Sequence, residues 1–170
     1  MKRHFEDELD ALKKQLVQMA CNVEKAVEAA TEALQQNSPD AIRRVDQIER
    51  RINLAHKEVD EQCVNLLALQ QPLAMDLRLI VAVIKINSDL ERMGDQAVNI
   101  SQNALLYLKG EPVPGLEDDF AAMFREVRLI VHEAIDSFIR NDEALAHTVL
   151  RRDDVVDGYK HKIFREVSKR

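Results

Sequence analysis

The sequence predicts an all-α protein built from long amphipathic helices. Its 170 residues include only four glycines, four prolines and no tryptophan, and the residues that dominate it favour helices. No segment shows the strict alternation of apolar and polar residues that is typical of a half-buried strand. Apolar residues instead recur at steps of three and four along several long stretches, the pattern of helices that bury one face.

Capping residues and helix breakers divide this pattern into five segments. Ser38 suits an N-cap and Pro39 suits the first helical position, so the second helix begins there. Gln71-Pro72 ends that helix, and a Pro- and Gly-rich stretch after Gly110 ends the third. Asp142 is a candidate cap for the last helix. The expected helices cover residues 5–36, 39–70, 75–109, 117–140 and 143–170.

The chain repeats itself at an offset of 104 residues, which carries Asn37 onto Asn141 and Glu49 onto Asp153. This offset aligns the first two helices with the last two without a gap, and it indicates duplication of a helical unit. We therefore expect tandem three-helix bundles of which the second is incomplete. The expected divisions are a first bundle over 1–109, a linker over 110–116 and the first two helices of a second bundle over 117–170.

The third helix has no second copy, because its Leu77 would recur at position 181, beyond the C-terminus. Two interpretations are open: a truncated chain, or a natural short form that borrows a helix from a partner. In either case the hairpin formed by the last two helices would leave apolar faces uncovered. We expect that hairpin to pack on the first bundle or to dimerise.

The third predicted helix carries oxygen-bearing side chains at steps of four: Asn87, Glu91, Asp95 and Asn99. Carboxylates one turn apart are neighbours and can close on one cation. Gly94 lowers the helix propensity by about 1 kcal/mol relative to Ala, so we expect a packing or access reason for it. The apolar seam of this helix is expected at Leu79, Val83, Ile86, Leu90, Met93, Ala97, Ile100 and Ala104.

The same spacing recurs on the fifth helix at Asp153 and Asp157, and the second helix carries Glu49 and Asn53 at the repeat-related positions. Oxygen ligands of this kind suit Mg²⁺, Ca²⁺, Mn²⁺ or iron rather than a structural zinc site. The alternative is an ordinary solvated acidic face, and for the fifth helix both interpretations stay open.

Composition excludes several classes of function. The net charge of −6 argues against non-specific binding of nucleic acid. No apolar run reaches the roughly 18 residues of a membrane-spanning helix. Cys21 and Cys63 form no disulfide framework and are expected to be small buried apolar residues in a reducing compartment. The chain has no Glu-x-x-His pair, Gly-x-Ser-x-Gly turn or phosphate-binding loop, so it shows no nucleophile for catalysis.

A second unusual run, Leu-Ala-Leu-Gln-Gln-Pro followed by Asp-Leu-Arg-Leu-Ile, lies at the corner between the second and third helices. Asp76 is expected near a helix N-terminus, where a negative charge is stabilising. Arg78 could pair with a carboxylate or a phosphate.

Together with Asp-Leu-Glu-Arg-Met-Gly-Asp-Gln-Ala-Val-Asn-Ile on the third helix, this run closely resembles the PhoU family of phosphate-uptake regulators. The resemblance implies two similar three-helix bundles and metal clusters held through Glu/Asp-x-x-x-Asp motifs. Those motifs fall on Glu91 and Asp95 and on Asp153 and Asp157. On the second helix the motif falls on Glu49, but Asn53 replaces its second acid, which weakens that ligand.

The resemblance also implies a function. The expected protein is a cytoplasmic, non-enzymatic adaptor between the ATPase of a phosphate ABC transporter and a membrane sensor kinase, and it represses phosphate-starvation genes. We expect a homodimer that can associate with the membrane surface, that binds iron, Mn, Mg or Zn, and that does not bind nucleic acid. The alternative is a metal-dependent hydrolase or redox enzyme that uses the same carboxylates.

Overall fold

The computed structural model describes residues 2–36, 38–109 and 115–169 and is helical almost throughout. No strand occurs within these ranges, so the all-α prediction is confirmed. Each predicted helix is present, with bounds that differ from the expected ones by a few residues. The five helices are α1 (Lys2–Gln36), α2 (Pro39–Gln70), α3 (Ala74–Lys109), α4 (Leu116–Arg140) and α5 (Glu143–Ser168).

The predicted caps of α2 and α5 are both present. The backbone N–H of Ala41 donates to Ser38 Oγ at 3.2 Å, and that of Leu145 donates to Asp142 Oδ1 at 2.9 Å. Each bond satisfies one of the N–H groups that a helix leaves unpaired in its first turn. The predicted stop at Gly110 and the repeat-related turn residue Asn37 lie outside the described residues.

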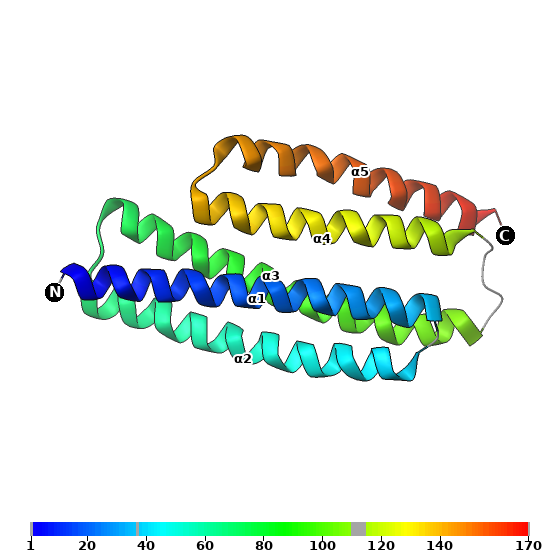
Figure 1. Ribbon diagram of the computed structural model, residues 1–170, viewed down its shortest axis with the longest axis horizontal. Helices are drawn as coiled ribbons and strands as arrows, with labels where there is room; N and C mark the ends of the chain where they lie inside the picture. Colours follow the sequence, from blue (N-terminus) through cyan, green and yellow to red (C-terminus); the bar gives the residue numbers. More distant parts are fainter. Residues whose placement is uncertain (1, 37, 110–114, 170) are drawn as a thin grey trace.

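Helices α1, α2 and α3 form one bundle, and the α4–α5 hairpin lies alongside it on the side of α1 (Figure 1). Among the described helices, α4 packs against α1, whereas α5 has close contacts with α4 alone. The hairpin therefore packs on the first bundle, which is one of the two outcomes expected from its uncovered apolar faces. Figure 1 also shows that the corner between α2 and α3 projects farther along the molecule than the turn between α4 and α5.

Helix α1 is the centre of the core because it packs against α2, α3 and α4. The face predicted from its periodicity is buried along its whole length. Apolar surface is removed from water on several sides of this helix, which explains why its stripe is wider than a simple seam. Its buried residues include Leu9, Leu12, Leu16, Met19, Ala20, Val23, Ala26, Val27, Ala30, Ala33 and Leu34.

The buried face of α3 is rotated from the predicted seam. The residues that face α1 and α2 are Ile80, Val83, Asn87, Leu90, Gly94, Ala97, Ser101 and Ala104, all buried. Leu79, Ile86, Met93 and Ile100, which were expected in the seam, are only partly buried. The reason is that Ile86, Met93 and Ile100 face a groove beside α4. Helix α3 thus has two apolar faces, and the predicted seam lies between them.

The two cysteines differ in environment. Cys63 is fully buried, and burial, followed by the charge of Asp60, raises the pKa of its thiol to about 11. Cys21 is partly buried on α1, where it lines a small hollow beside α4. The expectation of a small buried apolar residue therefore holds fully for Cys63 and only partly for Cys21.

Iodoacetamide should label Cys21 and spare Cys63 in the folded protein at pH 8. With a pKa of about 11, only about one Cys63 thiol in a thousand is ionised at that pH, and burial restricts access further. Mass spectrometry of tryptic peptides after timed labelling measures both rates. Labelling of both cysteines at equal rates in the folded protein would contradict the burial of Cys63. Equal rates after denaturation are expected.

Candidate metal-binding face between α2 and α3

Helices α2 and α3 pack tightly against each other at Gly94. A Cβ atom on Gly94 would lie 3.1 Å from Cδ1 and 3.3 Å from Cγ2 of Ile52. Both residues are buried. A methyl group at Gly94 would force Ile52 to shift by a few tenths of an ångström, so close packing is a reason for the glycine despite its unfavourable helix propensity.

Two turns along α3, Asn87 fixes how the two helices align. Its side chain is fully buried, and its Nδ2 donates to the backbone oxygen of His56 at 3.0 Å. Asn87 was expected to extend the surface stripe of ligands, and the structure corrects this: it belongs to the helix interface. Asn87 Oδ1 and His56 Nδ1 are also buried, and neither has a hydrogen-bond partner among the described residues.

The candidate ligands of α2 and α3 occupy corresponding positions around this contact. Glu49 and Asn53 lie three residues before and one residue after Ile52. Glu91 and Asp95 stand in the same relation to Gly94. Because the helices run antiparallel and meet at these two residues, both pairs belong to the same layer of the bundle.

Within that layer the four side chains differ. Glu91 is partly buried and Asp95 is exposed. This follows from geometry, since residues at steps of four rotate by about 40° per step around a helix and wind from the interface towards solvent. On α2, Asn53 Nδ2 donates to Glu49 Oε1. Asn53 therefore acts as a donor to its neighbour rather than as a second carboxylate.

Asp153 and Asp157 lie on α5 and are exposed. Asp157 pairs with Lys160 on the same helix, at 3.6 Å from carboxylate oxygen to Nζ. Asp153 instead lines a groove of about 350 Å³ between α3, α4 and α5, together with Asp89 of α3. Apart from these two acids the groove is apolar, and Val156 contributes to it from the repeat-related position of Ile52.

The candidate ligands carry carboxylate and amide oxygens, the donor type that a hard cation prefers. Within the described residues, no three or more His, Cys, Asp or Glu side chains are grouped closely enough to hold a metal ion. Two carboxylates on one helix, with Glu49 in the same layer of the neighbouring helix, could supply only part of a coordination shell. Water would supply the rest, as is common for Mg²⁺. A structural zinc site would need four closely placed ligands, mostly Cys and His.

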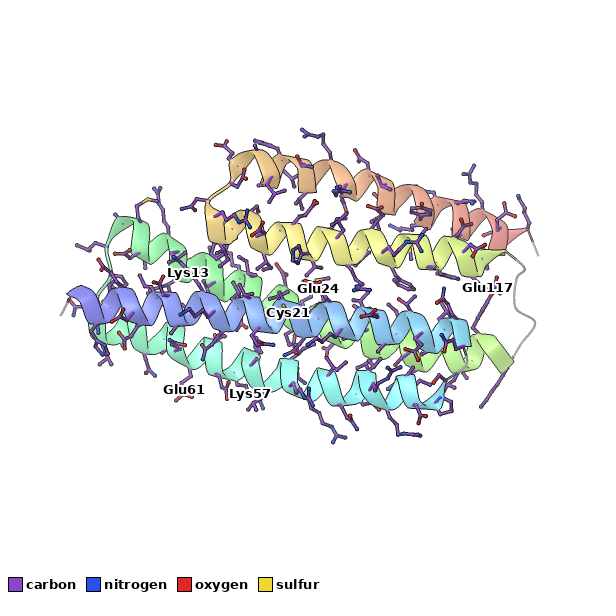
Figure 2. All side chains as sticks on the ribbon, in the orientation of Figure 1. Lys13, Cys21, Glu24, Lys57, Glu61 and Glu117 are labelled. Carbon is purple, nitrogen blue, oxygen red and sulfur yellow. The ribbon has the colours of Figure 1, made fainter. Side chains whose placement is uncertain are left out.

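The hairpin is joined to the first bundle by ion pairs as well as by apolar contacts. Figure 2 shows Glu24 of α1 on the side that faces α4. There Glu24 Oε1 lies 3.3 Å from His132 Nδ1, and one turn away Glu28 Oε1 lies 3.3 Å from Arg128 Nη1. These surface pairs contribute little to stability but help to orient α4 on α1.

A family model described as the PhoU domain matches residues 16–104 and 120–170. The chain belongs to the PhoU family. The "Phosphate-specific transport system accessory protein PhoU homolog" of Aquifex aeolicus is 38% identical over 161 residues, which are 94% of this chain and 72% of the relative. The Pseudomonas putida homologue of the same name is 33% identical, and the match covers 97% of this chain and 64% of that protein.

The fold agrees with an experimental structure of another PhoU protein. The crystal structure of PhoU from Pseudomonas aeruginosa matches with a TM-score of 0.90 and 34% identity, over 97% of this chain and 79% of that one. The matched relatives and structure are thus longer than this PhoU chain.

The interface role of Asn87 was not predicted from the sequence. A signal was present, because Asn87, Gly94 and Ser101 recur every seven residues along α3. Small or amide side chains at that spacing are typical of a face packed closely against a neighbour. Asn87 also continues the spacing of Glu91 and Asp95, and that spacing predicts a surface position.

The contact at Gly94 predicts strong coupling to Ile52. Gly94→Ala should be at least about 1 kcal/mol more favourable in an Ile52→Ala background than in the wild type, because removal of Cδ1 and Cγ2 makes room for the new methyl group. Urea denaturation of the four proteins in this cycle gives the coupling energy. Additive free energies would show that α2 and α3 are not this close in solution.

Proposed function

We propose that this PhoU chain is a non-enzymatic regulator of phosphate uptake. It acts in the cytoplasm as an adaptor between the ATPase of a phosphate ABC transporter and a membrane sensor kinase, and it keeps phosphate-starvation genes repressed when phosphate is plentiful. The observation that carries this proposal is the PhoU-domain match over residues 16–104 and 120–170, in a fold with a TM-score of 0.90 to a PhoU crystal structure. The relatives are named as accessory proteins of a phosphate-specific transport system.

Action by contact is the mechanism that we propose. None of the described helices is long and apolar enough to cross a lipid bilayer. The enzymatic alternative would need a nucleophile or a Glu-x-x-His pair, and the sequence contains no such pair. An adaptor of this kind works by binding one state of its partner better than another, which shifts the population of states without turnover.

The metal is a further part of the proposal. Glu91 and Asp95 would hold a divalent or transition metal ion with Glu49 beside them, and Asp153 and Asp157 would form a second, weaker site. What supports this is the shared layer of Glu49, Glu91 and Asp95 around the Ile52–Gly94 contact. A cation there would reverse the local charge and attract anionic groups of a partner or a membrane surface.

The Glu91→Ala, Asp95→Ala double variant should lose most of its metal uptake and keep its helicity. Both side chains lie outside the buried face of α3, so their removal leaves the core intact. Equilibrium dialysis against Mn²⁺, followed by elemental analysis, measures the bound metal, and circular dichroism checks the fold.

A matched control is available on α1. Glu6 and Asp10 are exposed acids with the same spacing of four, so Glu6→Ala, Asp10→Ala changes the net charge equally. This control should bind metal as the wild type does. Equal uptake by all three proteins would remove Glu91 and Asp95 as ligands.

The regulatory function is tested in a bacterial strain that lacks its own PhoU protein. The wild-type chain should restore repression of a phosphate-starvation reporter in phosphate-rich medium, and the Glu91→Ala, Asp95→Ala variant should restore it only weakly. The Glu6→Ala, Asp10→Ala control should behave as the wild type.

Two outcomes would contradict separate parts of this proposal. Absence of repression with stably expressed wild-type protein would contradict the regulatory function. Full repression by the Glu91→Ala, Asp95→Ala variant would leave that function standing but remove the metal-binding face as a signalling surface. The predicted homodimer can be checked on the same proteins by light scattering.

A further inference from the structure

The corner between α2 and α3 exposes an unusual amount of apolar surface. Leu69, Leu73 and Met75 are 78%, 80% and 70% exposed, and Leu77 and Val81 are 42% and 40% exposed. These five side chains, which we name the corner patch, lie within thirteen residues of sequence at one end of the molecule. Single exposed leucines are ordinary on protein surfaces, but a concentration of this kind marks an interaction site.

The backbone of the corner holds this patch outwards. Gln71 and Ala74 have φ angles of 44° and 47°, a left-handed conformation that residues other than glycine rarely adopt. Pro72, between them, prevents α2 from continuing as a helix. The corner also projects beyond the α4–α5 turn, so the hairpin does not cover it (Figure 1).

An acidic hollow adjoins the corner patch. This hollow, of about 360 Å³, lies between α1 and α2 and is lined by the carboxylates of Glu8, Glu58 and Glu61. Leu69 belongs to both the hollow and the patch, so the two surfaces are continuous. Neither Glu58 nor Glu61 forms an ion pair with a described residue, and Figure 2 shows Glu61 on the side of α2 away from the hairpin.

We propose that the corner patch and the acidic hollow together form the surface that docks on the transporter ATPase. The occupant is a protein surface with an apolar depression bordered by Lys or Arg: the depression receives Leu73 and Met75, and the basic side chains meet Glu58 and Glu61. This inference rests on the adaptor function proposed above and adds to it the face of the chain that makes the contact. That face is separate from the metal-binding face.

Charge favours a protein over a lipid surface as the occupant. A membrane site usually combines apolar side chains with Lys and Arg, because cytoplasmic membrane surfaces are negative. Here the acids of the hollow border the apolar patch, the exposed Asp76 and Arg78 within the corner cancel in charge, and the whole chain carries a net charge of −6. An anionic bilayer would be repelled, whereas a basic rim on a protein would be attracted.

The test compares two double variants in a binding titration with the purified transporter ATPase subunit. Leu73→Ser, Met75→Ser removes the centre of the corner patch. Leu106→Ser, Leu150→Ser is the matched control, because Leu106 and Leu150 are also exposed, at 68% and 70%, but lie on α3 and α5 away from the corner. We expect the corner variant to bind about tenfold more weakly or worse and the control to bind within about twofold of the wild type.

A third variant tests the acidic hollow. Glu58→Gln, Glu61→Gln should weaken binding at low salt and should flatten its dependence on ionic strength, because charge pairs at the rim of an interface are screened by salt. All four proteins should show the same helicity and the same melting temperature, since the substituted side chains are exposed.

The outcomes separate this inference from the proposed function. If the wild type binds the ATPase and the corner variant binds equally well, the docking surface is elsewhere and the adaptor function stands. If the wild type does not bind the ATPase at all, the adaptor function fails and this surface fails with it. Corner-dependent binding to vesicles of phosphatidylglycerol and phosphatidylcholine, without binding to the ATPase, would identify a membrane site and overturn the proposal.

Discussion

The close approach of α2 and α3 at Ile52 and Gly94 is the constraint on which the first bundle depends. A hydrogen atom in place of a side chain lets Ile52 pack directly on the α3 backbone. The same contact places Glu49 on one helix in the same layer of the bundle as Glu91 and Asp95 on the other. Core packing and the candidate metal-binding face are therefore one feature, because any change that separates the helices also separates the carboxylates.

Sequence patterns predicted the helices well because their limits are set locally. Ser38 and Asp142 were recognised as caps from their neighbours alone, and Pro72 stops α2 wherever α2 packs. The buried face of α3 could not be placed in the same way. Apolar residues on this helix serve two neighbours, the α1–α2 pair and the groove beside α4. When one helix buries two faces, the spacing of its apolar residues indicates a single buried face that lies between the two real ones.

The candidate site was predictable in part for a related reason. Spacing within one helix shows that Glu91 and Asp95 are neighbours, but only the alignment of two helices shows that Glu49 belongs with them. The repeat also predicts that the two halves of the chain match position by position, and the structure departs from this match. Arg152 stands where the first unit has the apolar Ile48, and it links α5 to Glu126 and Glu133 of α4 by ion pairs at 3.4 and 2.8 Å. At this position the two halves thus join their helices by different chemistry.

The buried amide of Asn87 has a mechanical consequence. Its hydrogen bond to the carbonyl of His56 exists at only one relative position of α2 and α3. If α3 slid by a turn along α2, the amide would lose this partner inside the core, and that loss is unfavourable. A piston-like movement between these helices is thereby disfavoured.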